Sequence, residues 1–141
     1  MSFLLDTTAL SELTKPRPNS GYLQWVSAHS TDEAFIGAPS IGELEIGITL
    51  LDRSKKRRSL EAWLLKLISD FDGRILPFDA AAARVWGRAV GSARRNGLAL
   101  AATDSQIAAI ACIHGLAVVT RNIRHFESPQ FGQLDVINPW N

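Results

Sequence analysis

The sequence lacks the features that mark secreted and membrane proteins. It has one cysteine, Cys112, so no disulfide can form within the chain, as expected in a reducing compartment. No run approaches the roughly 18 apolar residues of a membrane-spanning helix. The apolar start is interrupted at Asp6 with no basic segment before it, unlike a signal peptide. We therefore expect a cytoplasmic protein that does not enter a membrane.

The chain also lacks an excess of charge of either sign. Fifteen basic and 14 acidic residues leave a formal net charge of +1, so the whole molecule has no general electrostatic attraction to nucleic acids or membranes. Basic residues do gather locally, because the segment RSKKRRS (53–59) carries five cations. This segment is either a solvated loop between helices or a surface that contacts RNA, to which Arg84, Arg88 and Arg95 of a later helix would add.

Several catalytic motifs are absent as well. The chain has no glycine-rich phosphate loop, no nucleophile elbow and no paired cysteine and histidine. It also has no internal repeat, low-complexity segment or long Pro/Gly/Ser-rich linker. We therefore expect one domain over residues 1–141.

What the chain does have is a regular alternation of short apolar runs and longer segments of helical periodicity. The candidate strands are Phe3–Leu5, Ala34–Gly37, Arg74–Pro77, Leu116–Val119 and Leu134–Ile137. The candidate helices are Thr8–Thr14, Tyr22–His29, Ile41–Leu51, Ser59–Phe71, Ala80–Asn96 and Thr103–His114. Strands separated by helices predict an α/β fold, with a mostly parallel central sheet of about five strands and helices on both faces.

Three acidic residues stand where such a fold places its ligands. Asp6 ends the first strand, Glu43 lies early in a helix that follows a strand, and Asp104 lies at another helix start. One interpretation is capping, since Ser40-x-x-Glu43 and Thr103-x-x-Gln106 match the capping box. The other is metal binding, because strand ends and helix starts share one edge of a parallel sheet, where three carboxylates repel one another without a cation. Carboxylate oxygens suit Mg²⁺ or Mn²⁺, not zinc.

A fourth stretch, VVTRNIRHFE (118–127), sends polar residues to the same edge. Thr120 and Asn122 directly follow a buried strand, with Arg121 and Arg124 nearby to meet phosphates. The stretch is either an ordinary turn, which asparagine favours, or a source of neutral oxygen ligands.

Taken together, the motifs resemble those of the PIN-domain ribonucleases, and among them the VapC-type toxins of bacterial toxin–antitoxin pairs. The matching segments are LLDTTALSEL, SIGELEIGI, RILPFD, AATDSQIAAIA, VVTRNIRHFE and INPW, in that order along the chain. The resemblance implies a cytoplasmic, Mg²⁺- or Mn²⁺-dependent endoribonuclease that cleaves RNA with a metal-activated water. It also implies a homodimer held inactive by a cognate antitoxin.

The resemblance also assigns site residues. Asp6, Glu43 and Asp104 match the metal-binding carboxylates, and Thr120 and Asn122 match the last motif of the active site. The chain departs from the family pattern in three places: Thr8 replaces a frequent asparagine, and Asn122 and His125 stand where relatives have an aspartate. Because the last motif offers no acid, the resemblance leaves open whether the site binds one metal ion or two.

Two other functions compete with this one. Aspartyl-phosphate phosphohydrolases and receiver domains also open with a strand that ends in aspartate, but they use a lysine late in the chain, and the last lysine here is Lys66. A PIN-like module without catalysis would bind RNA or a partner through the basic residues. The dependence of activity on a metal separates the catalyst from the binding module.

Overall fold

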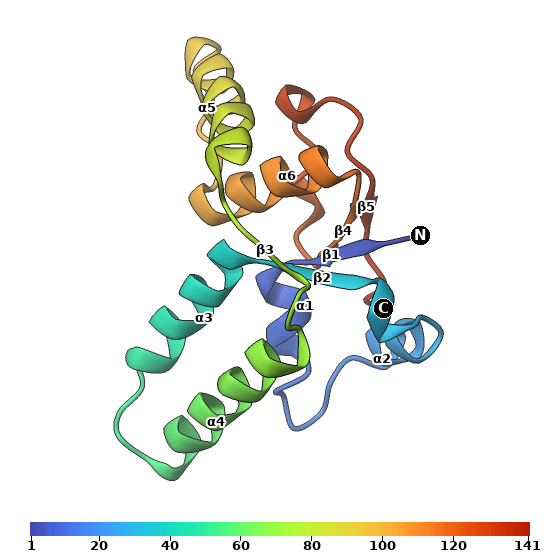
Figure 1. Cartoon of the computed structure of the whole chain (residues 1–141), viewed down its shortest axis with the longest axis vertical. Coiled ribbons are helices and arrows are strands. Elements are labelled where there is room, and N and C mark those ends of the chain that lie inside the picture. Colours follow the sequence, from blue (N-terminus) through green and yellow to red (C-terminus); the bar gives the residue numbers. More distant parts are fainter.

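The computed structural model describes residues 1–141, arranged around one five-stranded sheet (Figure 1). The strands are β1 (Phe3–Leu5), β2 (Ala34–Gly37), β3 (Ile75–Leu76), β4 (Ala117–Val119) and β5 (Val136–Ile137). Each neighbouring pair is parallel, and the order is β3-β2-β1-β4-β5. β2 and β3 lie on one side of β1, and β4 and β5 lie on the other. The strand order therefore reverses between β1 and β4, and this boundary is the topological switch point. Ligands of open α/β sheets bind there, at the carboxyl ends of the strands.

The predicted α/β class is confirmed, and so is each predicted helix. They are α1 (Thr7–Glu12), α2 (Ser20–Ser27), α3 (Ala38–Thr49), α4 (Lys55–Asp70), α5 (Ala80–Arg95) and α6 (Ala102–His114), with short 3₁₀ helices η1 (Thr31–Glu33), η2 (Ile123–His125) and η3 (Pro129–Phe131). Figure 1 shows α1, α3 and α4 on the opposite side of the sheet from α5 and α6. None of the helices is both long and apolar enough to cross a bilayer.

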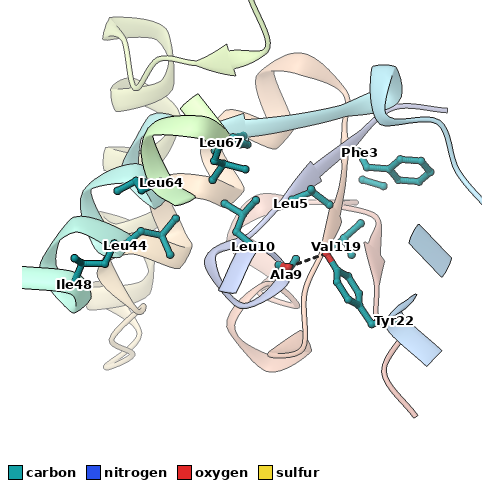
Figure 2. Close-up of a cluster of buried hydrophobic side chains, with 12 residues drawn as sticks. Phe3, Leu5, Ala9, Leu10, Tyr22, Leu44, Ile48, Leu64, Leu67 and Val119 are labelled. Carbon is teal, nitrogen blue, oxygen red and sulfur yellow. Dashed lines mark hydrogen bonds between the residues drawn. The ribbon is translucent and has the colours of Figure 1, made fainter. Parts of the chain in front are cut away.

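The two faces of the sheet bury two separate cores, because successive side chains of a strand point to opposite sides. Phe3 and Leu5 of β1 pack with side chains of α1 to α4, as Figure 2 shows, whereas Leu4 packs with α5 and α6. In the first core the Tyr22 hydroxyl donates to the carbonyl oxygen of Ala9 at 2.8 Å, which fixes α2 against α1. Both faces of β1 are therefore covered, and its polar atoms emerge only at its carboxyl end.

The starts of α3 and α6 differ from those that the sequence predicted. The N-caps are Gly37 and Ala101, neither of which offers a side-chain hydrogen bond, so the two predicted capping boxes are wrong. Pro39 in the first turn needs no amide partner, which lets α3 begin earlier. A Cβ on Gly37 would lie 3.3 Å from Ile110 of α6, so glycine permits the close approach of these two elements.

The start of α4 also corrects an interpretation. Ser54 is its N-cap and accepts a hydrogen bond from the Arg57 amide at 3.1 Å. Residues 55–58 are therefore the first turn of a helix, and the alternative of a solvated loop between helices is wrong for most of the basic segment. Capping by Ser54 explains the difference, because it begins the helix at Lys55, four residues before the predicted start at Ser59.

Candidate active site

Asp6 and Thr120 occupy the switch point itself. They are the first residues after β1 and β4, and both are fully buried. The Asp6 amide extends the strand ladder by donating to the Val119 carbonyl at 3.1 Å. The Thr120 hydroxyl donates to Asp6 Oδ2 at 2.5 Å and accepts from the Asn122 amide at 2.8 Å. The two strand ends are thus joined through the side chains that the sequence singled out.

The other carboxylate oxygen of Asp6 is also satisfied. Oδ1 accepts from the Ala9 amide at 2.9 Å, which makes Asp6 the N-cap of α1, and from the Thr8 hydroxyl at 2.6 Å. Burial raises the pKa of Asp6 above its usual value, while the bonds from Thr120, Thr8 and Ala9 lower it and the nearby charge of Asp104 raises it. Asp6 is therefore both the N-cap of α1 and a member of the acidic site.

Above Asp6 lies a hollow of about 470 Å³, here named the acidic hollow. Its lining comes from α1, α3, the start of α6 and the segment after β4: Thr7, Thr8, Ser11, Glu43, Ala101, Ala102, Thr103, Asp104, Asn122 and His125. Of the predicted site residues, Glu43, Asp104 and Asn122 line the hollow, whereas Asp6 and Thr120 are buried outside this lining. All five predicted site residues thus lie at the carboxyl edge of the sheet, where the sequence predicted them.

Asp104 has a partner that the prediction of site residues missed. Its Oδ2 lies 2.5 Å from Nδ1 of His125, and its side chain is only 15% exposed. Burial raises the pKa of Asp104, the pairing with His125 lowers it, and the charge of Glu43 raises it. The sequence shows His125 and Thr8 as departures from a motif, but nothing in their spacing reveals that each bonds to a site carboxylate.

The acids influence one another without forming a ready metal cage. Asp104 is within electrostatic reach of both Asp6 and Glu43, yet no three acidic, histidine or cysteine side chains are close enough together to hold a metal ion as they stand. The donor set is carboxylate oxygens with the Asn122 amide, which fits a hard divalent cation such as Mg²⁺ or Mn²⁺. A cation there would compete with the hydrogen bonds that now hold Asp6 and Asp104.

Comparison with known proteins agrees with this fold. The family described as the PIN domain matches residues 3–131. The chain is 34% identical over 141 residues to VapC ribonuclease Y4jK of Sinorhizobium fredii, covering 97% of this chain and 96% of that protein. It is 35% identical over 139 residues to toxin FitB of Neisseria gonorrhoeae, covering 98% of each.

A solved structure is similar over the same length. The crystal structure of FitAcB from Neisseria gonorrhoeae superposes with a TM-score of 0.87 at 34% identity, covering 99% of both chains. Because the family match spans most of the chain and the likeness to these relatives runs from end to end, the resemblance noted in the sequence is confirmed. The chain belongs to the PIN domain family.

Proposed function

We propose that this chain, as one PIN domain over residues 1–141, is a metal-dependent endoribonuclease and the toxin of a toxin–antitoxin pair. The observation that carries the proposal is that Asp104 lies within electrostatic reach of both Asp6, at the switch point of the sheet, and Glu43, which shares with it the lining of a hollow open to solvent. The names of the relatives, a VapC ribonuclease and the toxin FitB, support the same conclusion.

In this proposal Asp6, Glu43 and Asp104 hold Mg²⁺ or Mn²⁺. When bound, such an ion lowers the pKa of a water molecule and neutralises charge on a phosphodiester. The chain's other site residues position these acids. Thr120 and Thr8 fix the Asp6 carboxylate between β1 and β4, and His125 orients Asp104. Asn122 offers a neutral amide to the hollow where RNA would lie.

The proposed partners are RNA, a cognate antitoxin protein and a second copy of the chain. The antitoxin is supported by the likeness to toxin FitB and to the FitAcB structure, both of Neisseria gonorrhoeae.

Cleavage of RNA by the purified protein tests the proposal. Single-stranded RNA should be cut with Mg²⁺ or Mn²⁺ and left intact in EDTA. Asp6→Ala and Asp104→Ala should each lose about a hundredfold or more in rate, the scale for removing a main electrostatic stabiliser. Asp72→Ala removes an exposed acid in the loop after α4 and should cleave like the wild type.

Two results would contradict the proposal. Cleavage that persists in EDTA would exclude the metal-dependent mechanism. A wild-type protein that binds RNA but cuts none with either ion would favour the alternative of a PIN-like binding module, which the lack of a ready metal cage supports.

A further inference from the structure

A second hollow, here named the arginine pocket, adjoins the acidic hollow. It measures about 350 Å³ and is lined by Arg121, Asn122, Ile123, Arg124, His125 and Asn138. Asn122 and His125 line both hollows, so the two share a wall. One side of this wall presents the carboxylates of Glu43 and Asp104, and the other presents two guanidinium groups.

The two arginines of the pocket are unpaired. Both are exposed, and neither side chain makes a hydrogen bond or an ion pair within the chain. Two other arginines are engaged in the fold: Arg57 bonds to Glu61 and to the carbonyl oxygen of Leu51, and Arg74 bonds to the carbonyl oxygens of Ala34 and Asp70. The remaining arginines resemble Arg121 and Arg124 in making no side-chain bond, but they do not border the acidic hollow. Arg121 and Arg124 therefore have no structural duty that explains their charge.

The backbone that carries these arginines is fixed to the acidic site. The amide of Arg121 donates to the Thr8 hydroxyl at 3.1 Å, and that hydroxyl donates to Asp6 at 2.6 Å. Arg124 and His125 lie in η2, which is anchored by the buried Phe126 directly after it. Because His125 contacts Asp104 and the Arg121 amide bonds to Thr8, two connections fix the position of the arginine pocket relative to the acids.

We propose that the arginine pocket binds a backbone phosphate of RNA next to the phosphate that lies over the acidic hollow. The inference rests on the proposed ribonuclease function and names how that site holds its substrate. A hollow lined by carboxylates repels a polyanion, so a neighbouring cationic site has to supply the attraction. The guanidinium fork matches two phosphate oxygens at once, which an ammonium group cannot do.

The basic segment 53–58 is the competing RNA surface, and its position disfavours it. It covers the first turn of α4 and the two residues before it, beside the end of α3 that points away from the sheet (Figure 1), whereas Glu43 lies in the first half of α3. Arg57 is also already bonded to Glu61 and to the carbonyl oxygen of Leu51, just after α3. A phosphate bound there would not be adjacent to one over the acids.

RNA binding in EDTA tests the arginine pocket apart from cleavage. We would titrate a short fluorescent single-stranded RNA with protein and follow anisotropy at several salt concentrations. Arg121→Ala and Arg124→Ala should each weaken binding about three- to tenfold and lower the slope of log Kd against log salt by about 0.7, the effect of one lost phosphate contact. Arg94→Ala, at the end of α5, and Arg58→Ala, in α4, are matched controls that should bind like the wild type.

The outcomes separate the two proposals. Pocket variants that bind like the wild type, controls that lose as much as the pocket variants, or a wild type that binds no RNA would each overturn the arginine pocket. A wild type that binds RNA through these arginines but never cuts it with Mg²⁺ or Mn²⁺ would support the pocket and contradict the proposed nuclease function.

Discussion

At the scale of single residues, Asp6 combines helix capping with membership of the acidic site. Its oxygens accept from the Ala9 amide and from the hydroxyls of Thr8 and Thr120, and its pKa is nevertheless raised by burial. A carboxyl whose pKa is raised in the folded state is disfavoured when ionised. Its contribution to stability is therefore lost as pH rises from the unfolded-state pKa, about 3.9, through the folded-state pKa.

Thr120→Val tests this account of Asp6. Valine fills the same volume but cannot donate to Asp6 or accept from the Asn122 amide, so we expect the free energy of unfolding at pH 7 to fall by about 1–3 kcal/mol. The bond from Thr120 is the largest influence that lowers the pKa of Asp6. The loss should therefore shrink near pH 4, where a carboxyl of ordinary pKa becomes protonated.

Urea denaturation at the two pH values measures the effect, with Thr120→Ser as the control that keeps the hydroxyl. Equal stability of the valine and serine variants at both pH values would show that the bond to Asp6 contributes nothing.

The site residues also show which features the sequence could predict and which it could not. Asp6, Glu43, Asp104, Thr120 and Asn122 were predicted for one edge of the sheet because strand ends and helix starts are visible as changes of periodicity, and the structure places all five there. Their role as metal ligands stays a prediction. The bonds from His125 to Asp104 and from Thr8 to Asp6 depend on side-chain rotamers, which no periodicity encodes.

At the scale of elements, one buried carboxylate helps to hold the C-terminal segment after β5, together with the hydrogen bonds of Asn141 to the start of α2. Glu12 at the end of α1 accepts from Lys15 Nζ at 2.8 Å, from the Asn19 amide at 2.9 Å and from Trp140 Nε1 at 3.1 Å. The bond from Lys15, with those from Asn19 and Trp140, lowers the pKa of Glu12 to about 2. Trp140 in turn stacks on Tyr22 of α2, with the ring centroids 4.5 Å apart.

Glu12→Gln should weaken this attachment. A neutral amide has one acceptor oxygen for three donors, so we expect the free energy of unfolding at pH 7 to fall by about 1–3 kcal/mol. Because the pKa of Glu12 is lowered in the folded state, its contribution is present above the unfolded-state pKa and is lost as pH falls towards about 2. Wild type and variant should therefore converge in stability in acid.

Urea denaturation over this pH range is the measurement. Glu61→Gln removes an exposed partner of Arg57 and should change stability by less than about 1 kcal/mol. If Glu12→Gln behaves like Glu61→Gln, the bonds to Glu12 do not hold the segment.

The helices show which of their boundaries the sequence could predict. Apolar periodicity revealed all six helices, but α3 and α4 begin three and four residues before their predicted starts, α2 two residues before and α6 one residue before. Gly37 and Ala101 cap by backbone alone, and Ser54 caps ahead of a polar first turn, so no apolar stripe marks these starts. The short helices η1, η2 and η3 were not predicted, because three residues are too few to show a period.

At the scale of the whole molecule, a net charge of +1 conceals a separation of charge. Carboxylates line the acidic hollow and guanidinium groups line the arginine pocket beside it, both at the carboxyl edge of the sheet. The parallel topology brings them together, because β1 and β4 are neighbours in the sheet though far apart in the chain. The fold thus supplies the arrangement that composition alone does not reveal.

The central claim is that these acids gather to bind a divalent metal and do not act merely as helix caps. Melting curves of the wild type and Asp104→Asn, in EDTA and in Mg²⁺, test it most directly. Burial and Glu43 raise the pKa of Asp104 and the pairing with His125 lowers it, with a raised pKa as the net result. The neutral variant should therefore melt higher in EDTA, by about 2–5 °C.

Added Mg²⁺ should reverse this order, because an ion that binds only the folded wild type stabilises it by RT ln(1 + [Mg²⁺]/Kd). If Asp104 served only the dipole of α6, the variant would instead lose about 0.3–1 kcal/mol. A variant that melts lower than the wild type in EDTA, with a ranking that Mg²⁺ leaves unchanged, would contradict the account.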